Sequence, residues 1–131
     1  MTTSSGPKRP HHPETDILHA GRDPRSQHGF VNPSVYRGST VLFPTLEALE
    51  AYDKQPFRYG RHGTPTTAAL EEALTALDGG ARTVLTPSGY QAVTTAILAF
   101  VKAGDHILMV DSVYQPTRAF CDKFLAHLGV T

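Results

Sequence analysis

The feature that most restricts the fold is a regular alternation of helical and strand patterns after residue 63. Apolar residues recur at helical spacing in three segments, and two short runs of strand-forming residues lie between them. The expected order is a helix over 64–79, a strand over 82–86, a helix over 91–103, a strand over 106–110 and a last helix ending at Gly129. This order is typical of an α/β domain with a doubly wound parallel sheet.

Local signals predict the ends and faces of these helices. Thr64 is a capping residue followed by a proline, and Gly79 is expected to end that helix. The helix over 91–103 is apolar on nearly all sides, so we expect it to be buried on most of them. The strand over 106–110 is apolar throughout, like strands inside parallel sheets. In the last helix, the residues expected to face inward are Phe120, Phe124 and Leu128.

The first 63 residues carry weaker patterns. We expect a short helical turn over 15–20, an extended segment over 31–36 and a short helix capped by Thr45. Residues 1–13 contain no hydrophobic region and are expected to be disordered. The predicted organisation is an N-terminal arm with short helices over 1–63, followed by the start of an α/β domain over 64–131.

Two strands are few for a sheet of this kind, which usually has about five or six. Val130-Thr131 resembles the first step of a third strand. Two parallel strands cannot cover a helix that is apolar all round. We therefore expect the sequence to be the front part of a larger domain.

Composition excludes several classes of partner. The 131 residues suffice for one domain, and 12 basic residues balance 12 acidic ones without a run of either sign. Binding to nucleic acid or to an anionic membrane is therefore not expected. Cys121 is the single cysteine, and no apolar run suits a membrane span or a secretion signal, which favours a cytoplasmic setting. His11 and His12 are expected to be solvated, and no metal is expected.

A strand, a glycine turn and a helix follow one another directly over 84–93. The first turn of a helix leaves backbone N–H groups without partners and carries the positive end of the helix dipole, so it can bind an anion. Ser88 is a capping residue, and Gly89 has no side chain to keep a ligand from the backbone. The same residues also fit a tight turn without a ligand, and the pattern leaves both interpretations open.

Four segments together resemble one known family. They are Tyr59-Gly60-Arg61-His62-Gly63-Thr64-Pro65-Thr66, Pro87-Ser88-Gly89-Tyr90-Gln91-Ala92-Val93, Gly104-Asp105-His106-Ile107-Leu108 and Asp111-Ser112-Val113-Tyr114-Gln115-Pro116. Their order and spacing are similar to those of the Cys/Met-metabolism family of pyridoxal-phosphate enzymes, from Thr15 onward. The resemblance implies the N-terminal part of a fold type I, aspartate-aminotransferase-like large domain, preceded by an extended arm. It also implies pyridoxal 5'-phosphate as cofactor.

The resemblance implies cofactor contacts in the second half of the chain. The turn of Ser88, Gly89 and Tyr90 would hold the cofactor phosphate through backbone N–H groups, which agrees with the anion site inferred above. Tyr114 would stack on the pyridine ring. Without the family, Tyr114 also fits a half-buried packing tyrosine.

Two further residues are implied to act across a subunit interface. Tyr59 and Arg61 would reach the phosphate bound by the neighbouring subunit of a homo-oligomer, a dimer or a tetramer. Both side chains donate hydrogen bonds, and arginine can do so bidentately to an oxyanion. Without the family, this segment also fits a solvated loop.

The resemblance places the chemical end of the site beyond residue 131. In this family a lysine after a Ser-x-Thr element holds the cofactor as a Schiff base, an aspartate pairs with the pyridinium nitrogen, and an arginine binds the substrate carboxylate. The lysines present do not follow such an element; they are Lys8, Lys54, Lys102 and Lys123. No catalytic residue is therefore expected in this chain, apart from Tyr114 as a candidate.

Within the family, the resemblance favours β-lyases that cleave the carbon–sulfur bond of L-cystathionine, giving homocysteine, pyruvate and ammonia in methionine biosynthesis. Gly60, Thr64 and Gln115-Pro116 are more similar to these trans-sulfuration enzymes than to the γ-synthases and γ-lyases, which share every cofactor contact. A dinucleotide-binding domain with Asp111 as ribose acid is a weaker alternative, because Gly89 stands where three glycines are expected. A gene fragment without catalysis is the non-enzymatic alternative.

Overall fold

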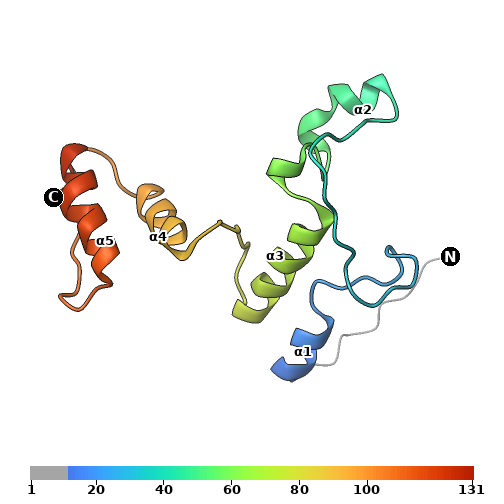
Figure 1. Cartoon of the computed structure of the whole chain (residues 1–131), viewed down its shortest axis with the longest axis horizontal. Helices are drawn as coiled ribbons and strands as arrows, with labels where there is room; N and C mark the ends of the chain where they lie inside the picture. Colours follow the sequence, from blue (N-terminus) through green and yellow to red (C-terminus); the bar gives the residue numbers. More distant parts are fainter. Residues whose placement is uncertain (1–11) are drawn as a thin grey trace. The chain divides into compact units, whose positions relative to one another are not determined.

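The structure is a computed structural model and describes residues 12–131. Two compact units make up the chain, one ending at Val84 and the other comprising Leu85–Thr131, and each is described by itself (Figure 1). Residues 1–11 lie outside the described residues, so the disorder predicted for them and the solvation predicted for His11 stay predictions. Pro13, by contrast, is the first residue of a helix. The predicted domain boundary between residues 63 and 64 stays a prediction.

The first unit is built around α3 (Pro65–Asp78). The hydroxyl of Thr64 accepts a hydrogen bond from the Thr67 amide at 3.3 Å, and the Thr67 hydroxyl accepts one from the Thr64 amide at 2.8 Å. This reciprocal capping box and Pro65 in the first turn start the helix, as predicted. Gly79 ends it in the left-handed conformation, which confirms the predicted end.

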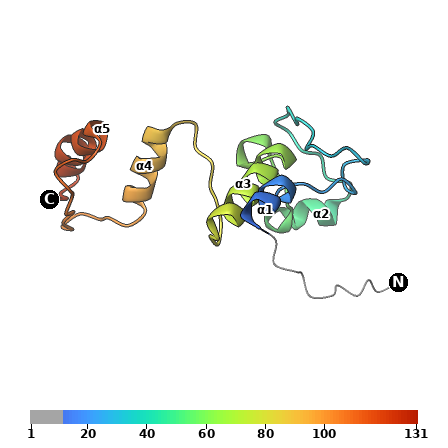
Figure 2. The same cartoon turned by 90° about the horizontal axis from the view of Figure 1, so that it is seen from below.

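Helix α1 (Pro13–His19) lies against α3 (Figure 2). It begins two residues earlier than the sequence predicted, because Pro13 is its first residue and proline is favoured in the first turn of a helix. Gly21 follows the helix with φ of +69°, and a side chain there would overlap the carbonyl of Ala69 on α3. Glycine is therefore required where the chain leaves α1.

The remaining elements of the first unit are short. They are α2 (Leu46–Glu50) with the predicted cap Thr45, and the 3₁₀ turns η1 (Tyr52–Lys54) and η2 (Gly60–His62). Residues 31–36 have no regular structure, and Thr66 holds them to α3. Its hydroxyl donates to the Ser34 carbonyl and accepts from the Tyr36 amide, both at 2.8 Å.

The second unit contains α4 (Gly89–Leu98) and α5 (Gln115–Ala119), which continues directly into the π-helical segment η3 (Phe120–Leu125). Helices α4 and α5 contact each other. The small core of this unit consists of Phe120, Cys121, Leu125 and Val130, with Ile97, Val101, Ile107 and Met109 packed against it.

Two predictions about the burial of helices are wrong. Helix α4 ends at Leu98 rather than near residue 103 and has no buried residue, while Phe100 is 88% exposed. In the last helix, Phe124 and Leu128 are about half exposed, and Leu125 is buried instead. Leu125 lies four residues after the buried Cys121 and eight after the buried Thr117, so the inner face follows this row rather than Phe124 and Leu128.

The predicted strands, 82–86 and 106–110, have no regular structure and form no ladder within the described residues. The amide of Thr131 donates to the Asp105 carbonyl at 3.0 Å, and the amide of Ile107 donates to the Thr131 carbonyl at 2.7 Å. These two bonds lie on either side of His106, which is the pattern of parallel pairing. Val130-Thr131 thus pairs with the start of the 106–110 segment, as expected for a step of a third strand.

Candidate cofactor site

The predicted anion site is formed at the start of α4 by Ser88, Gly89 and Tyr90, the α4 corner. Ser88 has an extended backbone, and its Oγ accepts a hydrogen bond from the Gln91 amide at 3.1 Å. The Thr86 hydroxyl donates to the Ser88 carbonyl at 3.0 Å and braces the turn. Gly89 and Tyr90 are the first two helical residues, and α-helical geometry gives their amides no carbonyl acceptor within the helix. These two amides are the donors that an anion would use.

Gly89 is not required by the packing of this unit. A side-chain carbon at this position would meet no atom within 4 Å, and its φ is not positive. The open space therefore lies directly beside the first-turn amides. This arrangement fits a phosphate group, because a phosphate needs backbone N–H donors and room to approach them.

Tyr90 connects the corner to the core of the second unit. Its ring meets the ring of Phe120 edge-on, with 6.3 Å between ring centres and 87° between planes. The tyrosine side chain is 48% exposed, so one side packs on the core and the other faces solvent. The ring thus anchors the first turn of α4.

Tyr114 lies immediately before α5. Its carbonyl accepts hydrogen bonds from the amides of Thr117 at 2.9 Å and Arg118 at 3.2 Å. The side chain makes no capping bond and is 67% exposed, so one face of the ring can pack on a planar group. Among the described residues, no hydrogen bond or ring contact joins Tyr114 to the α4 corner, although α4 and α5 are in contact.

Tyr59 and Arg61 lie together in the first unit, so their position relative to the α4 corner stays a prediction. The guanidinium carbon of Arg61 is 4.9 Å from the centre of the Tyr59 ring, a cation–π contact. Tyr59 forms an antiparallel bridge with Thr40, and the amide of Gly60 donates to the Ser39 carbonyl at 2.6 Å. The loop is therefore held in a fixed shape that presents an exposed arginine.

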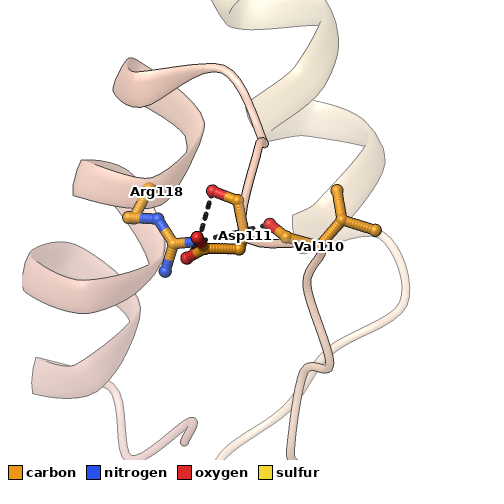
Figure 3. A network of polar contacts seen from close by, with 3 residues as sticks. All are labelled: Val110, Asp111 and Arg118. Atoms are coloured by element: carbon orange, nitrogen blue, oxygen red, sulfur yellow. Dashed lines mark hydrogen bonds and ion pairs between the residues drawn. The ribbon is translucent and has the colours of Figure 1, made fainter.

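An arginine that the sequence analysis missed holds the loop before Tyr114. The guanidinium of Arg118 donates to the carbonyls of Val110 at 3.2 Å and Asp111 at 3.1 Å, and lies 3.4 Å from the Asp111 carboxylate (Figure 3). No local sequence signal identifies such a contact, because it joins a helix to the end of the preceding extended segment.

Other chemistry is limited in the described part of the chain. Burial raises the pKa of the Cys121 thiol, with a further contribution from Asp122, so the thiol is protonated at neutral pH. Within residues 12–131, no three potential metal ligands of the His, Cys, Asp and Glu types lie together. No helix in this range is long and apolar enough to cross a membrane.

The chain belongs to the family of Cys/Met metabolism PLP-dependent enzymes, whose family model matches residues 14–131. The cofactor of this family is pyridoxal phosphate. The family therefore replaces the weaker alternative of a dinucleotide-binding domain.

Individual relatives are consistent with that family. The "Putative cystathionine beta-lyase" of Rhizobium johnstonii is 57% identical over 116 residues, which is 88% of this chain and 29% of the relative. The cystathionine beta-lyase of Salmonella typhimurium is 43% identical over 122 residues, 90% of this chain and 31% of the relative. The crystal structure of cystathionine gamma-lyase from Lactobacillus plantarum, complexed with L-serine, matches with a TM-score of 0.78 and 28% identity, over 92% of this chain and 30% of that one.

The chain thus spans about 30% of the length of these relatives. It has part of the fold of the PLP-dependent Cys/Met metabolism enzymes.

Proposed function

We propose that this chain is the N-terminal part of a cytoplasmic carbon–sulfur β-lyase that cleaves L-cystathionine, with water, to homocysteine, pyruvate and ammonia in methionine biosynthesis. The observation that carries the proposal is the identity of 43% to a cystathionine beta-lyase over 90% of the chain. The matched region includes the α4 corner, whose open space at Gly89 suits the cofactor phosphate.

The described residues would bind and orient the cofactor. The amides of Gly89 and Tyr90 would donate to its phosphate, while Ser88 keeps the first turn of α4 in shape through its bond to Gln91. Tyr114 would lie on one face of the pyridine ring. When bound, the cofactor supplies an electron sink for the carbanion formed beside the substrate amino group. The lysine and aspartate that complete this chemistry would come from residues after 131.

Tyr59 and Arg61 would serve the neighbouring subunit. The loop that carries them is held to residues 38–40 by backbone contacts, and Arg61 has no ion pair among residues 12–131. Its charge is therefore available to a phosphate on another chain. This supports a homo-oligomer, a dimer or a tetramer, in which residues 1–63 act as an arm.

A γ-synthase or γ-lyase is the second candidate, since the structure of a cystathionine gamma-lyase matches with a TM-score of 0.78. Both classes would use the same cofactor contacts. A chain that ends at residue 131 and has no catalysis is the third candidate.

Sequencing the gene past codon 131 and assaying the encoded protein separates the three candidates. An open reading frame with a lysine after a Ser-x-Thr element, and formation of pyruvate and homocysteine from L-cystathionine, would support the β-lyase. Formation of 2-oxobutyrate and cysteine would assign a γ-lyase. A stop codon directly after Thr131 would remove the proposed activity.

A further inference from the structure

Arg118 holds both ends of the loop that precedes α5. Its backbone amide donates to the Tyr114 carbonyl at 3.2 Å. Its guanidinium donates to the carbonyls of Val110 and Asp111 at 3.2 and 3.1 Å (Figure 3). Within the loop, the Val113 amide donates to the same Val110 carbonyl at 3.2 Å. A single residue therefore closes the Val110–Tyr114 loop at its first and last residues.

The contact to backbone carbonyls matters more than the ion pair. The Asp111 side chain is fully exposed, and its carboxylate is the most distant of the three acceptors at 3.4 Å. An exposed ion pair contributes little, whereas a charged donor shared between two carbonyls fixes the backbone itself. A guanidinium suits this task because each terminal nitrogen of the planar group carries two N–H donors in fixed directions, and Nη2 of Arg118 faces both carbonyls.

Few contacts of its own hold the Tyr114 ring. The side chain makes no capping bond and is 67% exposed, so the backbone of the loop decides where the side chain begins and which positions the ring can reach. That backbone is held by α5 on one side and by the Arg118 guanidinium on the other. Helix α5 is in turn anchored by its buried Thr117 and by Phe120, the first residue of η3.

We propose that Arg118 is a positioning residue that fixes the Tyr114 ring by clamping the Val110–Tyr114 loop onto α5. The consequence for cofactor binding rests on the proposed function, in which Tyr114 lies on the cofactor ring. The clamp itself does not depend on that function, because it acts on the backbone of the chain without ligand.

Hydrogen exchange on the 131-residue chain tests the clamp. In Arg118→Gln, exchange of the Val113 amide should accelerate by about five- to tenfold, since a charged donor to the loop carbonyls is lost. The Val130 amide, which donates to the Leu125 carbonyl in the core, is an internal reference that should not change. Arg118→Lys should restore part of the protection. Equal exchange of Val113 in the wild-type chain and in Arg118→Gln would overturn the proposal.

Two variants serve as controls. Asp111→Asn keeps both carbonyl contacts and should leave Val113 exchange within about twofold of wild type. Lys123→Gln removes a positive charge from η3, the adjoining helical segment, and should also have no effect, because the Lys123 side chain forms no hydrogen bond or ion pair with residues 12–131. Acceleration by Asp111→Asn as large as that by Arg118→Gln would overturn the carbonyl clamp in favour of the ion pair.

The affinity for added pyridoxal phosphate, measured by tyrosine fluorescence and absorbance, distinguishes the clamp from the proposed function. Arg118→Gln should weaken binding about fivefold, and should add nothing to the loss caused by Tyr114→Ala. If Val113 exchange accelerates while Tyr114→Ala leaves the affinity unchanged, the clamp is supported and the cofactor role of Tyr114 is overturned. Full additivity of the two losses would overturn the positioning of Tyr114 by Arg118.

Discussion

Gly60 lies so close to Gly38 that a side-chain carbon at position 60 would overlap the Gly38 carbonyl oxygen. The contact is reinforced by the neighbouring bond from the Gly60 amide to the Ser39 carbonyl. Gly60 lies in the sequence between Tyr59 and Arg61, the two residues proposed to reach a phosphate on another subunit. The geometry of these side chains therefore depends on a backbone contact that tolerates no side chain.

Replacement of Gly60 by alanine should distort this loop and destabilise the first unit by about 1–3 kcal/mol, because the added carbon must displace backbone. The matched control is Gly38→Ala, since a side chain at position 38 would meet no atom within 4 Å. Chemical denaturation of both variants measures the difference. Equal free energies of unfolding for the two variants would contradict the close contact.

Gly89 should behave in the opposite way to Gly60. A side chain there meets no protein atom, so Gly89→Ala should leave the free energy of unfolding unchanged or raise it by up to about 1 kcal/mol, as for other helical glycines. The same change should weaken the binding of pyridoxal phosphate, because the methyl group occupies the space beside the first-turn amides. Gly89→Asp should weaken it further by charge repulsion.

Isothermal calorimetry with pyridoxal phosphate and denaturation curves give the two readouts for Gly89. Gly80→Ala is the control, because position 80 is also open but lies outside the α4 corner. Loss of stability without loss of affinity would mean that Gly89 serves only the turn, which is the interpretation that the sequence left open.

Cys121 should react slowly with thiol reagents in the folded chain. The thiol is buried, and its pKa lies above the ordinary value of 9.0, so both access and thiolate formation are reduced. Reaction with an aromatic disulfide reagent at pH 7 should accelerate strongly on addition of denaturant. Rapid labelling without denaturant would contradict the packed core around Leu125.

The same shift predicts the direction of a pH effect on stability. A folded-state pKa that is raised above the unfolded value means that the folded chain keeps the thiol proton longer. Its contribution to stability is complete below the unfolded pKa and is lost as the pH rises through the folded pKa. Cys121→Ser should therefore flatten the decline in stability above about pH 9. An unchanged decline would assign it to other groups.

The predictions that succeeded rest on neighbours in sequence. The caps Thr45, Thr64 and Ser88 each bind an amide three residues ahead, so sequence alone identifies them. The start of α4 was predictable for the same reason, because its cap Ser88 and its first residue Gly89 are neighbours in sequence.

The features that sequence analysis missed depend on spatial partners. The last helix buries the row of Thr117, Cys121 and Leu125 rather than Phe124 and Leu128, and apolar residues occupy both rows, so periodicity alone does not decide between them. The Arg118 clamp and the Gly38–Gly60 contact join segments whose approach no local pattern encodes. Strands, likewise, are defined by their neighbours, and the 106–110 segment pairs only at its start, with Thr131.

The proposed role of Arg61 across an interface predicts complementation between two defective subunits of the complete enzyme. Arg61→Ala removes a phosphate donor that acts on the partner, and Gly89→Asp places a negative charge in the subunit's own phosphate turn. Each homo-oligomer should be nearly inactive. In a mixed dimer, however, one of the two sites combines an intact turn with an intact Arg61. After random reassembly of equal amounts, half of the dimers are mixed, so activity should recover to about a quarter of wild type. The control is wild-type enzyme dissociated and reassembled in parallel. If the mixture stays inactive while the control recovers, Arg61 acts within its own subunit or does not act on the phosphate.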